Sequence, residues 1–149
     1  MISKILAPTD GSETAKKSVN YAAGLAKQLG ATITLLSVID ISVILAQPIS
    51  AIASPGHLQE SVEDYMRQAA EACIQEATRI CKENGMQPET AIRSGHPVEE
   101  IVNEAVESKV DLIVMGSQGR SALKAAILGS VTFGVIHKDT KIPVLVVRK

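Results

Sequence analysis

Residues 2–39 read ISKILAPTDGSETAKKSVNYAAGLAKQLGATITLLSVI, and this stretch decides the fold class. Its ends, Ile2–Ala7 and Ala31–Ile39, are short apolar runs with the length of β-strands. Between them, apolar residues recur every three or four positions, which is the period of one α-helical face, and Ser12 and Gly30 stand where a helix begins and ends. A strand, a helix and a second strand in this order form the repeating unit of a parallel sheet. The apolar helical positions are Ala15, Val19, Ala22, Ala26 and Leu29.

The same alternation continues to the end of the chain. Further strands are predicted at Gln87–Arg93, Val110–Met115 and Ile142–Val147, and further helices from about Leu58 to Asn84, from Pro97 onward and after Ser130. We expect an α/β fold with one domain over residues 1–149: a doubly wound, three-layer α/β/α sandwich around a five-stranded parallel sheet. The buried stripe of the long helix is expected at Leu58, Val62, Tyr65, Ala69, Cys73, Ala77 and Ile80, and that of the last helix at Val131, Val135 and Ile136.

Composition limits the class of protein. Hydrophobic residues make up 46% of the 149-residue chain and aromatic residues only 2%, so aliphatic side chains must build the core. The formal net charge is −1 and there is no basic run, which argues against nucleic acid as a partner. No signal peptide is visible and no apolar run reaches the ~18 residues of a membrane helix, so we expect a cytoplasmic protein without a membrane partner. Cys73 and Cys81 lie about 12 Å apart on one predicted helix, too far apart for a disulfide, and are expected to be buried thiols.

The segment after the fourth predicted strand reads GSQGRSALKAAILGSV from Gly116 to Val131. Ligands of doubly wound sheets bind beyond the carboxyl ends of the strands, so a ligand is expected beside this segment. Gly116, Gly119 and Gly129 could let the backbone approach a ligand or adopt positive φ, and a helix N-terminus at Ser130 offers unpaired N–H groups to a phosphate. The alternative is that the glycines form ordinary turns and that Ser130 caps its helix, and spacing alone leaves it open. Neither a Walker A loop nor a G-x-G-x-x-G fingerprint occurs.

An acidic turn follows the first predicted strand, in the stretch Ala7-Pro-Thr-Asp10-Gly-Ser12. Asp10 could accept hydrogen bonds from a ribose hydroxyl or an exocyclic amine, or it could simply form the turn. Since the first and fourth strands flank the point where the winding reverses, Asp10 and the glycine segment are expected to face the same crevice. Arg120 is kept as a candidate phosphate contact, although a position in solvent is the alternative for it and for Lys124.

Three features together resemble the universal stress protein family: Asp10 with Gly11-Ser12, the spacing Gly116-x2-Gly119-x9-Gly129-Ser130, and the ending Ile142-Pro-Val-Leu-Val-Val147. The resemblance covers essentially the whole chain and implies the adenine nucleotide alpha hydrolase-like form of the fold. In that family the glycine spacing marks the members that bind ATP. The resemblance therefore implies ATP, or AMP or ADP, as the ligand, with Mg²⁺ or Mn²⁺ bridging the phosphates as a further expectation.

The resemblance also implies which residues line the site. Pro8, Thr9 and Asp10 are expected on the adenine and ribose side with Val38 at the tip of the second strand; Met115, Gly116 and Gly119 are expected along the nucleotide, and Gly129, Ser130 and Val131 at the phosphates. The sequence departs from the family at Gln118, Ser121-Ala122 and Thr132. These departures leave the side-chain contacts of the loop, and any help to hydrolysis, open. No spacing glycine is lost.

No catalytic or metal-binding pattern is recognisable in the sequence. His57, His96 and His137 are scattered and share no ligand spacing, and neither a G-x-S-x-G elbow nor a positioned general base occurs. The resemblance implies a regulatory, ATP-binding homodimer that acts in the stress response. The alternatives are a slow ATPase or other nucleotide-dependent enzyme, and a protein-interaction dimer without a nucleotide.

Two further segments carry sequence signals for a flap, a partner surface or a dimer contact. Ile41–Gly56 carries no charge and includes two prolines. It is interpreted as a flap over the nucleotide or as a surface for an unidentified protein partner, and an ordered packing element is the alternative. Ile142–Val147 is apolar, and Pro143 near its start is tolerated mainly on a sheet edge. Because an exposed apolar edge favours pairing with another chain, we predict an antiparallel, two-fold homodimer through this strand.

Overall fold

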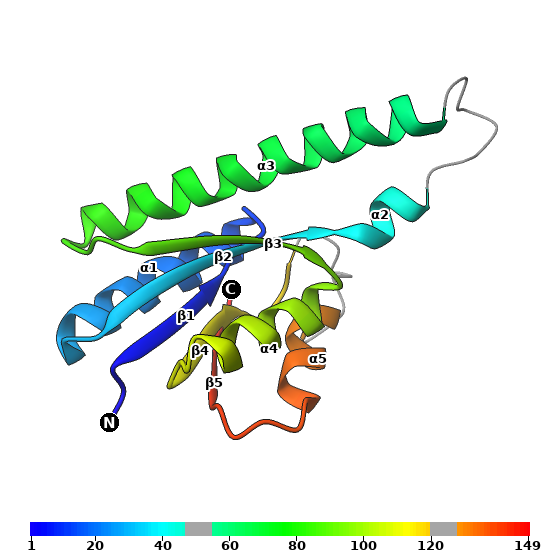
Figure 1. Ribbon diagram of the computed structural model, residues 1–149. Helices are drawn as coiled ribbons and strands as arrows, with labels where there is room; N and C mark the ends of the chain where they lie inside the picture. Colours follow the sequence, from blue (N-terminus) through cyan, green and yellow to red (C-terminus); the bar gives the residue numbers. More distant parts are fainter. Residues whose placement is uncertain (47–54, 120–127) are drawn as a thin grey trace.

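The computed structural model describes residues 1–46, 55–119 and 128–149, without the side chains of residues 44 and 55–61. Strands and helices alternate along the chain, as the sequence predicts, and paired strands run parallel (Figure 1). The elements are β1 (Lys4–Pro8), α1 (Glu13–Leu29), β2 (Thr32–Asp40), α2 (Ile41–Leu45), α3 (Pro55–Glu83), β3 (Glu89–Gly95), α4 (Pro97–Glu107), β4 (Leu112–Gly116), α5 (Ser130–His137) and β5 (Val144–Val147). None of the helices in these described ranges is long and apolar enough to cross a membrane.

The order of the strands in the sheet is β3-β2-β1-β4-β5. The chain winds outward from β1 to β3, returns to the other side of β1, and winds outward again through β4 to β5. The winding therefore reverses between β1 and β4, which pair Ile5 with Leu112 and Leu6 with Ile113. This order confirms the doubly wound α/β fold with a five-stranded parallel sheet.

The sheet has a hydrophobic core on each face. Ile5 and Ala7 of β1 pack in the core that contains residues of α1 and α3, whereas Leu6 packs in the core that contains residues of α4 and α5. Figure 1 shows the two pairs of helices on opposite sides of the sheet. The central strands β1 and β4 are thus buried on both faces, which explains why both are almost continuously apolar.

Local sequence signals set the ends of α1 as predicted. The Ser12 hydroxyl accepts a hydrogen bond from the Ala15 amide at 3.1 Å, and Gly30 ends the helix in the left-handed conformation with a φ of 65°. The predicted face is buried up to Ala26, but the prediction for Leu29 is wrong, since this side chain is 46% exposed. The reason is that the buried face ends one turn before the helix does.

The long helix α3 buries only the last part of the predicted stripe, since Ala77 and Ile80 are buried as predicted but the earlier positions are not. Tyr65 is 73% exposed, Ala69 is exposed and Cys73 is only partly buried, while Leu58 lies among the side chains that are not described. The sequence prediction went wrong because α3 carries small or apolar residues on two neighbouring stripes, and packing against the sheet selects only one of them. Among the described side chains of α3, the buried ones are Ala70, Ile74, Ala77, Ile80 and Cys81.

The short helix α5 also differs in one position. Val135 is buried as predicted, but Ile136 is 42% exposed, and Thr132 is buried in its place. Thr132 lies one turn before Val135 on the same face, and its hydroxyl donates a hydrogen bond to the Gly116 carbonyl at 2.8 Å. A hydrogen bond to β4 thus lets a polar side chain occupy this buried position.

The boundaries of the strands differ slightly from the predicted ones. Each strand begins one or two residues later than predicted, because pairing with the neighbouring strands determines where a strand starts. Within the uncharged stretch 41–56, Ile41–Leu45 forms α2 and Pro55 begins α3. Residues 47–54 lie outside the described residues, so the flap interpretation remains a prediction.

Candidate functional site

A cavity of about 460 Å³ opens beyond the carboxyl ends of β1, β2 and β4. The first turn of α5 and residues of α2, α3 and α4 complete its walls. It lies where the winding of the sheet reverses, which is the position expected for a ligand of a doubly wound sheet. Its volume is within the range of small-molecule sites, about 300–1,000 Å³.

The structure brings ten of the eleven predicted site residues to this one cavity. They come from the ends of three strands, the loop after β4 and the start of α5, so segments far apart in the sequence meet here. Arg120, the eleventh, lies outside the described residues, as does Lys124. The ten are Pro8, Thr9, Asp10, Val38, Met115, Gly116, Gly119, Gly129, Ser130 and Val131.

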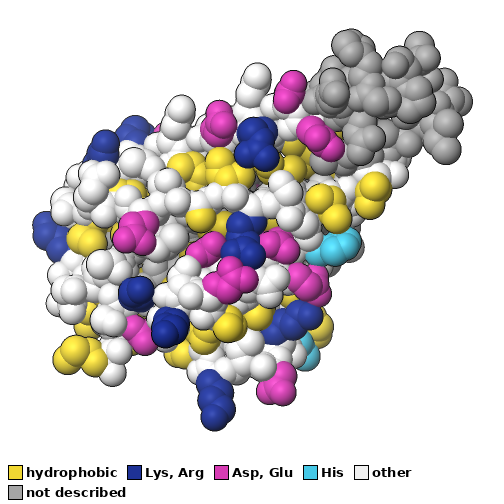
Figure 2. All heavy atoms as spheres, viewed as in Figure 1, with side chains coloured by type: hydrophobic (Ala, Val, Ile, Leu, Met, Phe, Trp, Pro, Cys, Tyr) yellow, Lys and Arg dark blue, Asp and Glu magenta, His cyan; other side chains and the backbone are white. Residues whose placement is uncertain are grey.

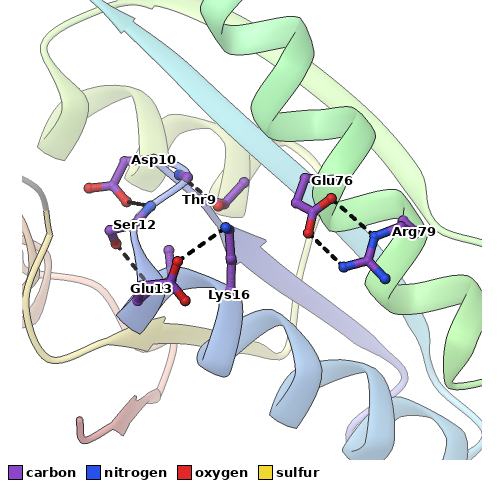
Figure 3. A network of polar contacts seen from close by, with 9 residues as sticks. Thr9, Asp10, Ser12, Glu13, Lys16, Glu76 and Arg79 are labelled. Atoms are coloured by element: carbon purple, nitrogen blue, oxygen red, sulfur yellow. Dashed lines mark hydrogen bonds and ion pairs between the residues drawn. The ribbon is translucent and has the colours of Figure 1, made fainter.

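The turn after β1 holds Asp10 by local hydrogen bonds. Asp10 Oδ1 accepts from the Ser12 amide at 2.9 Å, and Thr9 Oγ1 accepts from the Gly11 amide at 3.2 Å. Figure 3 shows Thr9, Asp10 and Ser12 together in the turn that leads into α1. One carboxylate oxygen of Asp10 therefore forms the turn, which was the alternative role considered for this residue. The other oxygen, Oδ2, faces Gly119, since a Cβ placed on that glycine would lie 2.6 Å from it.

Gly129 of the predicted motif allows close approach of backbone to backbone. A Cβ on Gly129 would lie 3.3 Å from both the Gln118 Cα and the Gly119 amide nitrogen. The Gly129 amide donates to the Ser117 carbonyl at 2.7 Å, which joins the start of α5 to the loop after β4. None of the three spacing glycines is among the described residues with positive φ, so their role here is space and not an unusual backbone conformation.

The first turn of α5 presents backbone amides to the cavity. Gly129 is the N-cap residue, which corrects the expectation that Ser130 could cap the helix, and no side chain of the described residues makes a cap hydrogen bond there. The amides of residues 130–132 have no acceptor within the helix, because the first N–H groups of any α-helix lack one. Ser130, Val131 and Thr132 all line the cavity. Unpaired N–H groups and the partial positive charge of the helix end make this wall suitable for an anion.

Several lining residues were missed by the sequence prediction. At the end of β2, Ser37 and Asp40 line the cavity beside Val38, and the rule that strand ends meet at one edge would have found them. Asp40 Oδ1 accepts from the Ser42 amide at 2.9 Å and from the Ser42 hydroxyl at 2.6 Å at the start of α2. No sequence signal pointed to the wall from α3, which consists of Tyr65, Met66, Ala69, Ala70 and Cys73.

Two groups of ion-paired side chains lie away from the cavity. The Glu76 and Glu83 carboxylates raise the pKa of the Arg79 guanidinium on α3, where Figure 3 shows the Glu76–Arg79 pair. Glu100, Glu107 and Glu104 likewise raise the pKa of Arg93 between β3 and α4. Figure 2 shows acidic and basic side chains interspersed over the face that it draws. None of these charged residues lines the cavity.

Comparison with known proteins gives one consistent family. The sequence profile of the universal stress protein family matches residues 1–148. The chain is 35% identical to universal stress protein YxiE of Bacillus subtilis, over 99% of this chain and 100% of that protein. It is 36% identical to universal stress protein MJ0577 of Methanocaldococcus jannaschii, over 100% of this chain and 96% of that protein.

Solved structures agree with the sequence comparisons. A structure of MJ0577 matches with a TM-score of 0.83 and 33% identity, covering 100% of this chain and 97% of that one. A universal stress protein solved in complex with cAMP matches with a TM-score of 0.68 and 25% identity, covering 99% of this chain and 97% of that one.

Proposed function

This chain belongs to the universal stress protein family, and from that premise we propose that it binds an adenine nucleotide, ATP foremost, in the cavity beyond β1, β2 and β4. The observation that carries the proposal is the wall formed by the start of α5 and the glycine-containing loop after β4. The related protein in complex with cAMP supports an adenine nucleotide as the ligand class.

The phosphates are assigned to the α5 end of the cavity. Main-chain amides at residues 130–132 can donate to phosphate oxygens, and the absence of a Cβ at Gly119 and Gly129 leaves room for close approach. Hydrogen bonds to charged acceptors are worth about 1.5–3 kcal/mol each, so three such donors would supply about 4.5–9 kcal/mol, a large part of the ~8.2 kcal/mol of micromolar binding. The ring and ribose would then extend toward β1 and β2, where Pro8, Thr9 and Val38 line the cavity.

A divalent ion fits this arrangement only as a bridge between phosphates. No three His, Cys, Asp or Glu side chains of the described residues are grouped so as to hold a metal ion. Mg²⁺ commonly keeps several water ligands and binds through one or two carboxylates and substrate phosphates. Asp10, whose Oδ2 faces Gly119, is the candidate protein ligand.

The experiment has two stages. Purified protein is denatured and the supernatant is assayed for adenine nucleotide; the nucleotide-free protein is then titrated with ATP by calorimetry. We expect Gly119→Val to weaken ATP binding while the fold survives, because the new side chain meets only the movable Asp10 carboxylate and lies in a surface loop. Asp10→Ala should weaken nucleoside recognition more than competition by inorganic phosphate. If both variants bind ATP like the parent, the cavity is not the nucleotide site.

We also propose that the protein works as a homodimer in the cytoplasmic stress response, with nucleotide occupancy altering its contacts with partners. β5 lies at one edge of the sheet and pairs with β4 alone among the described strands, and its four residues are only half-buried. Such an edge favours strand pairing with a second copy. Light scattering after size exclusion should give twice the chain mass, and a monomer mass at every concentration contradicts the dimer.

A further inference from the structure

The charges around the cavity do not by themselves match a polyphosphate. Of the described residues that line the cavity, only Asp10 and Asp40 carry a charge, and none is Lys, Arg or His. A phosphate monoester carries about −1.5 to −2 charges at pH 7, and each further phosphate adds to this. The backbone amides at the start of α5 offset only part of that charge. A triphosphate at the α5 end therefore calls for a cation from outside the lining.

Arg148 follows β5 at the edge of the sheet where the strands end. Val147 pairs with Gly116, and the Val147 carbonyl accepts a hydrogen bond from the Ser117 amide at 2.8 Å. The Ser117 carbonyl in turn accepts from the Gly129 amide at 2.7 Å. Two hydrogen bonds thus link the residue before Arg148 to the N-cap of α5. In Figure 1, α5 and β5 run in opposite directions, so the end of β5 and the start of α5 lie at the same edge of the sheet.

Arg148 also belongs to the face of the sheet that α5 covers. Leu145 and Val147 pack against the core that contains residues of α1 and α3, whereas Val144 packs against the core that contains residues of α4 and α5. Successive side chains of an extended chain point to opposite faces, which assigns Arg148 to the α5 face together with Val144. Neighbouring strands lie about 4.8 Å apart, and an extended arginine side chain is longer than that. The guanidinium can therefore reach across the end of β4 to the first turn of α5.

The Arg148 guanidinium is available to a ligand. The side chain is exposed and makes no hydrogen bond or ion pair with the other described residues. Arg93 of β3, by contrast, is held against α4 by the carboxylates of Glu100, Glu104 and Glu107. A guanidinium presents a planar fork of N–H donors that matches the oxygens of a phosphate, so Arg148 has the chemistry that the cavity lining lacks.

We propose that Arg148 binds the terminal phosphate of the nucleotide and so gives the cavity a preference for a nucleoside triphosphate over a monophosphate. This rests on the proposed function, which assigns the phosphates to the α5 end. A monophosphate is held by the α5 amides within the cavity lining. Only a longer polyphosphate extends past Gly129 toward the end of β5, where the guanidinium pairs with it. One side chain thus distinguishes nucleotides by the number of their phosphates.

The first test compares ligands of different phosphate number. Arg148→Gln is titrated by calorimetry with ATP, AMP and inorganic tripolyphosphate at one Mg²⁺ concentration. We expect ATP and tripolyphosphate to bind about three- to tenfold more weakly than they bind the parent, which is the effect of one charged contact that is open to solvent. AMP affinity should stay within about twofold. Arg148→Lys, which keeps the charge but loses the fork of donors, should show a smaller loss than Arg148→Gln.

Lys17→Gln is the matched control. Lys17 is also exposed and makes no hydrogen bond or ion pair with its side chain among the described residues. It lies near the start of α1, at the same edge of the sheet but on the opposite face. The substitution removes the same charge without touching the α5 face, so affinity for all three ligands should stay within about twofold.

The second test uses ionic strength. The Debye length falls from about 10 Å at 0.1 M to about 3 Å at 1 M, and exposed charge pairs weaken accordingly. The ATP affinity of the parent should therefore decline more steeply with added NaCl than that of Arg148→Gln. For AMP the two proteins should show the same dependence on salt.

Unchanged ATP affinity in Arg148→Gln overturns the role of Arg148, and so does an equal loss for ATP and AMP. A loss of the same size in Lys17→Gln also overturns it, because the effect is then one of overall charge and not of a contact. If the parent binds no adenine nucleotide, the proposed function fails and this inference fails with it. If the parent binds ATP and Arg148→Gln binds it equally well, the inference alone fails.

Discussion

Gly129→Ala tests the closeness of the two backbone segments on which the proposed phosphate site depends. The added Cβ would lie 3.3 Å from the Gln118 Cα and from the Gly119 nitrogen, and 3.6 Å from the Ser117 oxygen. Carbon atoms prefer separations of about 3.5–4.0 Å, so α5 and the loop must move apart by a few tenths of an ångström. The φ of −69° at this position suits any residue, so backbone strain adds no cost, although alanine is also a poorer N-cap residue than glycine.

The expected effect has a stability part and a binding part. One extra methyl in a packed region costs about 1 kcal/mol, which lowers the Tm of a domain of this size by roughly 2–4 °C. Displacing one or two phosphate-binding amides, each worth about 1.5–3 kcal/mol, should weaken ATP binding by about 10- to 100-fold. Thermal denaturation and calorimetric titration measure the two parts separately.

Gly134→Ala is the control within the same helix. Its Cβ would lie 2.6 Å from Val98 Cγ2, a harder clash, but Gly134 does not line the cavity. Its Tm should fall, although the better helix propensity of alanine offsets part of the cost, and ATP affinity should stay within about twofold. Parent-like ATP affinity in Gly129→Ala, or an equal loss in both variants, would refute the reasoning.

Three further predictions concern stability and reactivity. Gly24→Ala should raise the Tm by about 2–4 °C, because a Cβ there meets nothing within 4 Å and alanine favours the helix by about 0.8–1 kcal/mol; a lower Tm on thermal denaturation contradicts this. The Asp111 carboxylate accepts hydrogen bonds from the backbone amides of Ser3 and Lys4, and these bonds hold the pKa of the carboxyl below its usual value. The contribution of Asp111 to stability is therefore present above about pH 4 and is lost as the pH falls through the lowered pKa. Urea unfolding of Asp111→Asn should show reduced stability at pH 7 and a flatter decline in acid, and a decline as steep as the parent's counts against the assignment. Burial raises the pKa of the Cys81 thiol to about 11. At pH 8, iodoacetamide should therefore modify the partly exposed Cys73 and should modify Cys81 only after urea is added, which mass spectrometry can show.

The location of the site was predictable because it depends on rules that connect sequence to sheet edges. Asp10 follows β1 and Gly116 ends β4, and parallel strands bring their carboxyl ends to one edge. The spacing from Gly116 to Gly129 then placed a helix start beside that edge. These inferences needed only the order of the elements and not the packing of side chains.

The wall from α3 was not predictable in the same way. The sequence of α3 offers two stripes that could face the sheet. The sequence prediction placed Tyr65, Ala69 and Cys73 on the buried stripe before Ala77, but Ala70 and Ile74 occupy the buried positions there. Only contact with β2 distinguishes them, because both stripes have the helical period.

The amino-acid sequence by itself determined the alternation of strands and helices, the doubly wound class and the edge at which a ligand is expected, since periodicity and glycine or serine boundaries are local properties. The tertiary structure decided which face of α3 packs inward, that Gly129 leaves room for the backbone of the loop after β4, and that residues of α3 complete the cavity wall. These features depend on distances between segments that are remote in the chain, and such distances exist only once the layers have packed.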